Sequence, residues 1–381
     1  MAYQHAASSP WKAQADDSTQ MIGATTPQYK ENGFRNSGAP WYNVASWSKK
    51  KIGLVAAAIV VILVIVIVVP IETTKNKYPD YSALTYNLNS TFSGTSFFDN
   101  FDYFTGYDPT AGFVHYMLPE QAKPYNLTYA GADTAVVRVD NTVSDPNAHG
   151  RYSVRLTSKL AWDTGLFIFD VHHTPYGCSL WPALWTTNAN LASWPASGEI
   201  DIMESVNNAS SGNQMTLHTT DGCKMDVRRK ETGTILDTDC YNGTNANAGC
   251  GVQGVPSSFG SAFNANGGGI MAMELRTAGI RMWQFARNAI PSDITTQKPD
   301  PSTWGTALAD FPGTDCDIGT HFNNQSIVID IDVCGTWAGA ANVYNTQDGC
   351  PGLCTDYATQ NPSAFDEAYF EFGDFWIYQA S

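Results

Sequence analysis

The stretch Ser197–Ser205 reads S-G-E-I-D-I-M-E-S and carries three carboxylates, Glu199, Asp201 and Glu204, with apolar residues between them. Side chains in a β-strand point alternately to its two faces. Glu199 and Asp201 therefore share one face, and the two isoleucines between the acids point to the other face, which we expect to be the core. A regular strand would also turn Glu204 into that core, where a bare carboxylate is very costly.

A β-bulge near Ile202–Met203 removes this conflict, because one extra residue shifts the alternation and returns Glu204 to the face of Glu199. The Cα atoms of the two glutamates are then about 13 Å apart. Their side chains can lean together to a carboxylate separation of roughly 5–5.5 Å, which is typical of a glycosidase that retains the anomeric configuration. Asp201 can orient Glu199 and raise the pKa of the acid. A strand face exposed to solvent and a calcium-binding face remain alternatives. Three acids on one strand face without a lysine or arginine are unfavourable for an ordinary exposed face, because like charges repel.

Aromatic residues near this strand favour a carbohydrate site. Indole rings stack on the apolar faces of sugars, and the indole N–H can serve a hydroxyl group. Pro182 in the stretch W-P-A-L-W predicts a loop edge at 181–185, and hence the border of a cleft. His218, in the next predicted strand, could bond the acids or a sugar. The candidate substrate-binding residues are Trp181, Trp185, Trp194, His218 and Trp337, and each tryptophan could equally belong to the core.

The chain after residue 80 is predicted to be all-β. Its apolar runs are short, rich in β-branched and aromatic residues, and often alternate with polar residues. Strands are expected at 135–139, 152–157, 166–171, 270–275, 280–285, 326–333 and 369–378. Loops rich in glycine, asparagine and proline separate these runs, which predicts a sandwich or a barrel.

The segment 52–69 carries eighteen uncharged, mostly aliphatic residues. As a helix it would be about 27 Å long, close to the thickness of the hydrocarbon core of a bilayer. The lysines at 49–51 favour a cytoplasmic N-terminus. A long polar segment precedes the run and no small-residue cleavage site follows it, so a signal anchor fits better than a cleaved signal peptide or a buried core helix. We expect a single-pass type II membrane protein whose residues after Pro70 are extracellular or in the secretory lumen.

Cysteines and glycosylation sequons agree with this topology. An even number of cysteines in an oxidising compartment predicts up to four disulfides, whose pairing stays open among 105 possibilities. A zinc site at Cys350 and Cys354 is the alternative, but no second pair completes it. All eight cysteines follow the apolar segment: Cys178, Cys223, Cys240, Cys250, Cys316, Cys334, Cys350 and Cys354. So do five sequons, at Asn89, Asn126, Asn208, Asn242 and Asn324, as expected of a glycoprotein.

The net charge of −15 is concentrated after Lys51, where fifteen basic residues stand against thirty-three acidic ones. Such a surface repels phosphate groups, which argues against a nucleic-acid partner, whereas neutral sugars are unaffected. The glycine run 267–269 lacks the helix and lysine of a phosphate-binding loop. We expect no metal and no cofactor.

The sequence resembles glycoside hydrolase family 16, in its fungal laminarinase branch. The stretch G-E-I-D-I-M-E matches the E-x-D-x-x-E signature of that family. The surrounding motifs are also similar: G-C-S-L-W-P-A-L-W, M-T-L-H-T, F-N-A-N-G-G-G, C-D-I-G-T-H-F and G-C-P-G-L-C. The likeness covers roughly residues 81–379. It implies a concanavalin A-like β-jelly-roll sandwich of two curved antiparallel sheets, with the substrate cleft on the concave face.

The resemblance also implies an endo-1,3(4)-β-glucanase that hydrolyses β-1,3- or mixed β-1,3/1,4-glucan with retention. On this basis Glu199 matches the nucleophile, Glu204 the acid/base and Asp201 the assisting aspartate. The four tryptophans match aromatic positions that line the cleft, and His218 matches a histidine beside the catalytic strand. A transglycosylase that remodels cell-wall glucan is an alternative. A non-catalytic glucan-binding module is less favoured, because all three acids are present.

These observations divide the chain into four predicted regions. Residues 1–51 form a disordered cytoplasmic tail, and 52–69 form the transmembrane signal anchor. Residues 70–80 form a stalk, and 81–381 form the family 16 catalytic domain.

Overall fold

The structure is a computed structural model and describes residues 44–69, 73, 77–142 and 150–381. Most of the predicted cytoplasmic tail and stalk therefore lies outside the described residues. The chain divides into two units between Leu63 and Val64, and each is described by itself.

One helix dominates the N-terminal region. After the short η1 (Val44–Ser46), α1 (Lys49–Leu63) continues as the π-helical η2 (Val64–Val68). Together they form the 20-residue helix Lys49–Val68, in which a window of 18 residues has a mean hydropathy of 3.1 and no buried side chain. Within the described part of the chain, only this helix has the length and composition needed to cross a membrane. Its apolar character, together with the disulfides below, indicates the secretory pathway.

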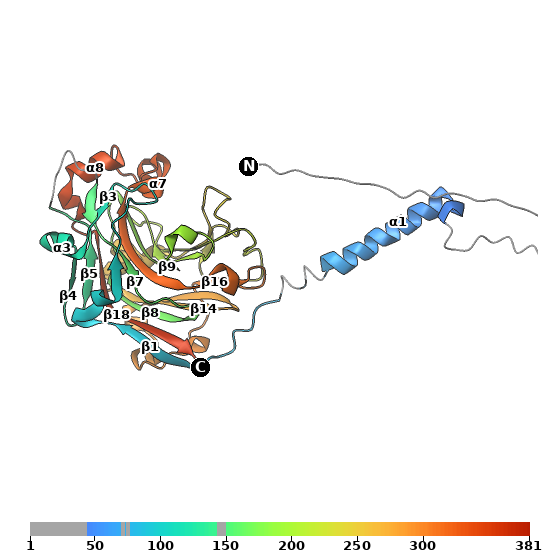
Figure 1. Ribbon diagram of the computed structural model, residues 1–381, viewed down its shortest axis with the longest axis horizontal. Coiled ribbons are helices and arrows are strands. Elements are labelled where there is room, and N and C mark those ends of the chain that lie inside the picture. Colours follow the sequence, from blue (N-terminus) through green and yellow to red (C-terminus); the bar gives the residue numbers. More distant parts are fainter. Residues whose placement is uncertain (1–43, 70–72, 74–76, 143–149) are drawn as a thin grey trace, which may run out of the picture. The chain divides into compact units, whose positions relative to one another are not determined.

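Two eight-stranded antiparallel sheets form the body of the second unit and lie against each other as layers (Figure 1). The order in sheet A is β16 (Ala309–Pro312), β15 (Gly279–Ala286), β14 (Gly269–Arg276), β8 (Gly165–His173), β18 (Tyr369–Ala380), β5 (Ala135–Arg138) and β4 (Thr128–Ala130), with β1 (Tyr86–Phe92) on β18. The order in sheet B is β12 (Thr234–Ile235), β13 (Cys250–Gln253), β11 (Gln214–His218), β10 (Glu199–Glu204), β9 (Leu180–Asn188), β17 (Gln325–Val333), β7 (Arg155–Ser158) and β2 (Phe101–Tyr103). A parallel pair, β3 (Val114–Tyr116) and β6 (Arg151–Ser153), stands apart from both.

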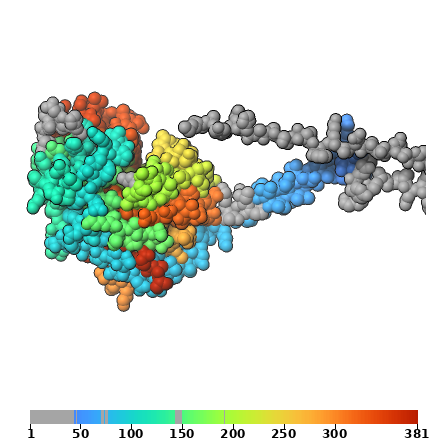
Figure 2. All heavy atoms as spheres, viewed as in Figure 1, coloured from blue at the N-terminus to red at the C-terminus, as the bar shows by residue number. Residues whose placement is uncertain are grey.

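The helices of this unit are short and lie in the connections. The α-helices are α3 (Pro119–Ala122), α4 (Gly260–Ala265), α5 (Ser292–Thr295), α6 (Ile318–His321), α7 (Gly335–Ala338) and α8 (Cys354–Gln360). The other helices are η3 (Gly94–Asn100), η4 (Lys123–Tyr125), η5 (Leu191–Ser193), η6 (Pro256–Ser258), η7 (Arg287–Ala289), η8 (Pro301–Thr303), η9 (Asn342–Gln347) and η10 (Pro362–Phe365). The segments that carry α7 and α8 gather at one edge of the domain (Figure 2).

The main core fills the space between the two sheets. Leu184, Ile200 and Ile329 contribute to it from sheet B, and Phe169 and Phe372 from sheet A, all without exposed surface. The predicted all-β sandwich is therefore confirmed, and its inner faces alternate with outer ones as the strand pattern indicates.

Two details of the strand predictions are wrong. The expected strand 152–157 is split, because β6 and β7 join different sheets and meet at Val154. The expected loop edge at 181–185 lies inside β9. Proline is tolerated there because the pairing of β9 with β10 ends at Ala183–Glu204, so Pro182 loses no ladder hydrogen bond on that side.

All eight cysteines are paired, which confirms the predicted disulfides and excludes zinc at Cys350 and Cys354. The pairs are Cys178–Cys350, Cys223–Cys316, Cys240–Cys250 and Cys334–Cys354. Two of them hold the region of η9 and α8 onto sheet B, next to Trp337. Among the sequon asparagines, Asn242 is half-buried and the other four are exposed.

The segment Lys77–Tyr86, which we call the strap, binds the outer side of sheet A. Tyr78 and Tyr81 donate to Asp310 at 2.9 and 3.3 Å, and Tyr86 donates to Glu274 at 2.8 Å. The guanidinium of Arg281 lies 4.1 Å from the ring centroid of Tyr81. The strap therefore fixes the start of the domain to the sheet opposite β10.

Candidate active site

A β-bulge in β10 brings Glu199 and Glu204 onto one face. On the β9 side, Asp201 pairs with Trp185 and Met203 with Leu184, so Ile202 has no partner. On the β11 side, three steps of β10 oppose two steps of β11. The bulge lies where the sequence predicts it. Ile202 and Met203 are both buried in the core, and Glu204 points to the outer face.

Glu204 and Glu199 each accept a hydrogen bond from an indole. Trp181 Nε1 donates to Glu204 Oε1 at 2.7 Å, and Trp194 Nε1 donates to Glu199 Oε2 at 2.9 Å. Trp194 precedes a cis proline and is exposed at its surface, whereas Glu204 is buried. Two of the predicted tryptophans therefore hold the carboxylates by their N–H groups. Trp337, from α7, meets the ring of Trp181 edge-on at 5.5 Å between centroids.

Asp201 faces His218, which pairs with Glu199 across β10 and β11. His218 Nε2 lies 3.4 Å from Asp201 Oδ2. The other ring nitrogen, Nδ1, lies 3.1 Å from Asn247 Oδ1. With an acceptor at each nitrogen, the ring can donate from both when it is protonated.

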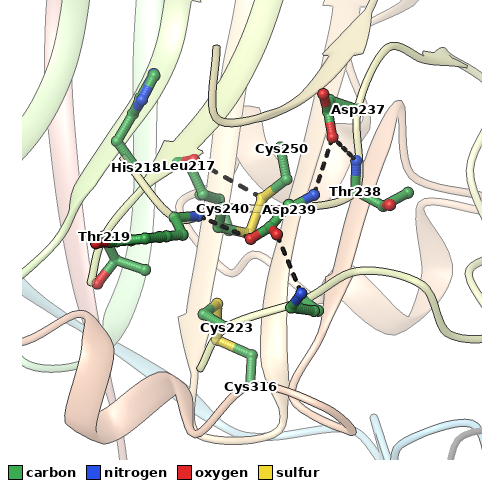
Figure 3. Close-up of a disulfide and its surroundings, with 12 residues drawn as sticks. Leu217, His218, Thr219, Cys223, Asp237, Thr238, Asp239, Cys240, Cys250 and Cys316 are labelled. Carbon is green, nitrogen blue, oxygen red and sulfur yellow. Dashed lines mark hydrogen bonds and ion pairs between the residues drawn. A yellow bond between two sulfur atoms is a disulfide. The ribbon is translucent and has the colours of Figure 1, made fainter. Parts of the chain in front are cut away.

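A disulfide loop supports this histidine. Asn247 lies in the segment closed by Cys240–Cys250, and its backbone has a positive φ of 64°, which asparagine tolerates. Figure 3 shows that disulfide beside the end of β11, where Thr219 N donates to Cys240 O at 2.9 Å. The loop therefore positions Asn247 at His218, and His218 at Asp201.

Trp185 differs from the other predicted tryptophans. It is buried, and its Nε1 donates to Asp330 Oδ1 at 2.9 Å. Arg155 lies over its ring at 4.9 Å and reaches Asp330 at 3.8 Å. Trp185 thus joins a buried charged pair beside the carboxylate strand.

The electrostatics of the site raise the pKa values of both glutamates. Burial, followed by the charge of Asp201, raises the pKa of Glu199 to about 7. The same two causes raise the pKa of Glu204 well above its ordinary value, although the indole of Trp181 opposes them. Burial alone would lower the pKa of His218, but its bond to Asp201 and the three surrounding carboxylates raise it to about 9. At neutral pH the histidine is therefore charged, and both glutamates hold a proton more tightly than a free carboxyl group.

One set of side chains has the spacing of a metal site. Single ligand atoms of Glu199, Asp201 and His218 lie within 4.8 Å of one another. A protonated imidazole has no lone pair to offer a metal. With a histidine pKa of about 9, this set favours a hydrogen-bonded acid cluster over a cation site.

Sequence reasoning missed three residues of this region. Asn247 lies in a loop without a motif. Arg155 and Asp330 lie on β7 and β17, which long-range pairing places on the far side of β9 from β10. The sequence offered one signal, for Asp330: it is an acid within the apolar run that includes Val328 and Ile331, and a carboxylate in a buried run is unusual.

Comparisons with known proteins agree with this geometry. A sequence profile described as the XgeA-like, catalytic GH16 domain matches residues 101–378. The chain is 45% identical over 310 residues to a probable glycosidase of Schizosaccharomyces pombe, covering 80% of this chain and 72% of that protein. It is 40% identical over 309 residues to a probable endo-1,3(4)-beta-glucanase of Aspergillus niger, covering 78% of this chain but only 40% of that protein.

Two solved structures share the fold at substantial identity. Laminarinase 16A of Phanerochaete chrysosporium, with 6-O-glucosyl-laminaritriose in its donor and acceptor sites, is 44% identical with a TM-score of 0.74. An elongating family 16 β-1,3-glucosyltransferase is 40% identical with a TM-score of 0.72. Each comparison covers 77% of this chain and all of the other. The carboxylate strand, the sandwich and these relatives together show that the chain is an enzyme of glycoside hydrolase family 16, of the fungal laminarinase type.

Proposed function

We propose that this enzyme is a retaining endo-β-glucanase that hydrolyses β-1,3- or mixed β-1,3/1,4-glucan by double displacement. The observation that carries the proposal is the bulge at Ile202, which turns Glu204 to the face of Glu199. We expect their carboxylates to lie roughly 5–5.5 Å apart, as a covalent intermediate requires. The names of the fungal relatives and the indoles that bond both glutamates support a glucan substrate.

In the first step, Glu199 attacks the anomeric carbon and Glu204 gives its proton to the leaving oxygen. The glycosidic bond breaks, and an ester joins the sugar to Glu199. In the second step, Glu204, now a carboxylate, takes a proton from water while the water oxygen attacks the same carbon. Glu199 leaves as a carboxylate, so two inversions retain the β-configuration.

The assignment of roles follows the family resemblance, in which Glu199 matches the nucleophile and Glu204 the acid/base. In such a pair, the group whose surroundings push its pKa higher keeps the proton and acts as the acid. Burial and the charge of Asp201 raise the pKa of Glu204 well above its ordinary value, which suits the role of the acid. Asp201 orients the pair and is itself held by the charged His218 at 3.4 Å.

Transglycosylation is the second candidate, because it shares the same intermediate. The observation that favours it is the 40% identity to a β-1,3-glucosyltransferase. A sugar hydroxyl would then replace water in the second step. The glucan-binding module without catalysis is disfavoured, since Glu199, Asp201 and Glu204 are all present and lie on one strand.

We also propose that the helix Lys49–Val68 anchors the enzyme as a type II protein, with the catalytic domain extracellular or luminal. The three lysines at the start of this helix and the four disulfides after it support this orientation. Protease added to sealed microsomes should remove only the N-terminal segment. A catalytic domain that is unglycosylated and digested in intact microsomes would overturn the topology.

Proton NMR of the first product tests the proposed chemistry directly. A β-glucan oligosaccharide should yield an initial product of β-configuration, before mutarotation mixes the anomers. An initial α-product would mean inversion and would overturn the double displacement.

A further inference from the structure

The mechanism above gives no role to one buried acid beside the site. Asp332 of β17 pairs with Trp181 of β9, so its side chain lies on the same face of sheet B as the indole that donates to Glu204. Asp332 is 4% exposed, and among the described residues it forms no ion pair with a lysine or arginine. A buried acid without a cation is costly unless it is neutral, which raises the question of its proton.

The loop between β2 and β3, residues 104–113, closes over this acid. A Cβ atom on Gly112 of the loop would overlap Asp332 Oδ1. A Cβ atom on Gly335, at the start of α7, would lie 2.8 Å from Asp332 Oδ2 and 3.0 Å from Trp181 Cε3. The carboxyl group and the indole therefore pack against the same glycine, and a shift of one changes the space of the other.

The hydrogen bonds of Thr110 show where the protons lie. Its hydroxyl contacts Asp108 Oδ2 and, at 3.0 Å, Asp332 Oδ2, but it has only one proton to donate. Asp108 Oδ2 also accepts from the backbone N–H groups of Thr110 and Gly112 at 2.8 and 3.0 Å, as a carboxylate oxygen does. Thr110 therefore donates to Asp108, and its contact with Asp332 needs a proton on Asp332 Oδ2.

The surroundings of Asp332 agree with a protonated carboxyl group. Its Oδ1 accepts from Val333 N at 2.6 Å, which leaves Oδ2 as the hydroxyl oxygen. Burial, followed by the charge of Asp108, raises the pKa of Asp332 well above its ordinary value. No side chain of α7 titrates. The titratable and charged groups around it are Asp108 from the loop, Asp330 from β17, Tyr116 from β3, and Arg155 from β7, which pairs with Asp330.

We propose that Asp332 is a positioning residue, which acts as a neutral, protonated acid and holds Trp181 in place for its hydrogen bond to Glu204. The inference rests on the function proposed above, because this bond matters only if Glu204 gives and takes the proton of the reaction. Thr110 fixes the carboxyl group of Asp332 from the loop, and the carboxyl group fills the space beside the indole. An ionised Asp332 would lose its bond to Thr110 and add a negative charge beside the site.

Asp332→Asn tests the proton, because an amide N–H donates to Thr110 as the acid does. With laminarin, a β-1,3-glucan, as substrate, kcat should stay within about twofold of native and the pH–rate profile should not move. Asp332→Leu keeps the size but removes the hydrogen bond, and kcat should fall about three- to tenfold. Since the indole bond lowers the pKa of Glu204, a loosened indole should move the alkaline limb to higher pH.

Trp181→Phe tests whether the effect passes through the indole. It removes the N–H donor and should move the alkaline limb to higher pH. Asp332→Leu added to Trp181→Phe should bring no further shift, because both changes act on one bond. Thr110→Ala replaces Asp332→Leu if that variant does not fold, since Thr110 is a half-buried loop residue, and the limb should move in the same direction. Thr105→Ala, at an exposed threonine of the same loop, is the matched control with a native profile.

Two outcomes would overturn this role of Asp332. A fall in kcat for Asp332→Asn as large as for Asp332→Leu or Thr110→Ala would show that the ionised carboxylate is needed. An alkaline limb that stays in place in the single variants, or shifts that add fully in the double variant, would show that Asp332 does not act through Trp181. A native enzyme that releases no reducing sugar from laminarin would instead overturn the proposed function.

Discussion

The outer faces of the two sheets each carry a group of acidic residues, and the two groups are stabilised differently. On sheet A, Glu274 accepts from Tyr86 and from the guanidinium of Arg281, and lies 3.5 Å from Arg276. On sheet B, Glu199, Asp201 and Glu204 have two indoles and one histidine, and no lysine or arginine is paired with them among the described residues.

This difference separates a structural role from a catalytic one. A buried carboxylate with a guanidinium partner contributes to stability only while the pair is complete. Carboxylates crowded together without such partners share protons, because burial and mutual repulsion raise their pKa values. The crowded group can therefore exchange protons with a substrate near neutral pH, whereas Glu274 holds the strap to sheet A.

The largest expected effect is on catalysis. Glu199→Ala should lower kcat by at least about a thousandfold, because it removes the nucleophile. The free energy of unfolding of this variant should not fall below the native value, because the substitution removes a buried charge that lies close to other carboxylates. Steady-state kinetics and denaturant unfolding measure the two quantities. Added azide should restore turnover with an inverted product.

Glu204→Ala distinguishes the second glutamate. It should still form the glycosyl-enzyme from a donor with an activated leaving group, which needs no proton. Azide should then accelerate turnover and yield a β-product. Identical behaviour of the Glu199 and Glu204 variants towards azide would contradict the assigned roles.

On sheet A, a substitution is expected to lower stability and to leave the chemistry unchanged. Glu274→Ala should destabilise the domain by about 3–5 kcal/mol, because it leaves Arg281 without its buried partner. The fraction that remains folded should keep the native product configuration. Urea unfolding measures the loss, with Glu120→Ala, an exposed acid on α3, as a control within about 0.5 kcal/mol of native. Equal stability of the two variants would remove the contrast between the sheets.

The pH dependence of activity should follow the two raised pKa values. Activity should rise from the acid side with an apparent pKa near 7, as Glu199 ionises, and fall at higher pH as Glu204 loses its proton. Asp201→Asn should lower the rate and move both limbs to lower pH, because the charge that raises both pKa values is gone. A pH–rate profile with unmoved limbs would contradict this role.

Stability should also depend on pH through Glu199. Its pKa rises from 4.5 to about 7 on folding, so between these values the folded protein holds a proton that the unfolded chain has lost. The free energy of unfolding therefore falls as pH rises through this window. Glu199→Gln should make that slope shallower in denaturant unfolding at a series of pH values.

The smallest effect is expected at Asn247. Asn247→Ala removes the acceptor at His218 Nδ1, and kcat should fall about three- to tenfold, as for one hydrogen bond. The histidine pKa should fall as well, which NMR titration can follow. Asn245→Ala, in the same disulfide loop, is the matched control. An unchanged histidine titration would show that Asn247 only supports the loop.

Local pattern was sufficient to predict the carboxylate strand. The alternation of Glu199, Ile200 and Asp201 assigns faces, and the cost of burying Glu204 predicts the bulge, because both arguments use only neighbouring residues. The apolar run before Pro70 and the even cysteine count likewise predict the apolar helix and the disulfides from composition. The resemblance to the family then favoured a sandwich over a barrel.

Long-range pairing decided the rest. Cys178 pairs with Cys350 across 172 residues, and spacing cannot choose among the possible pairings. Trp185 and Trp194 look alike in the sequence, yet one is buried against Asp330 and the other bonds Glu199, because each depends on strands or loops that only folding brings near. The contact of Thr110 with Asp332 has the same origin, since 222 positions separate the two residues in the chain. The sequence by itself determined which residues can do chemistry, and the tertiary structure decided which of them meet.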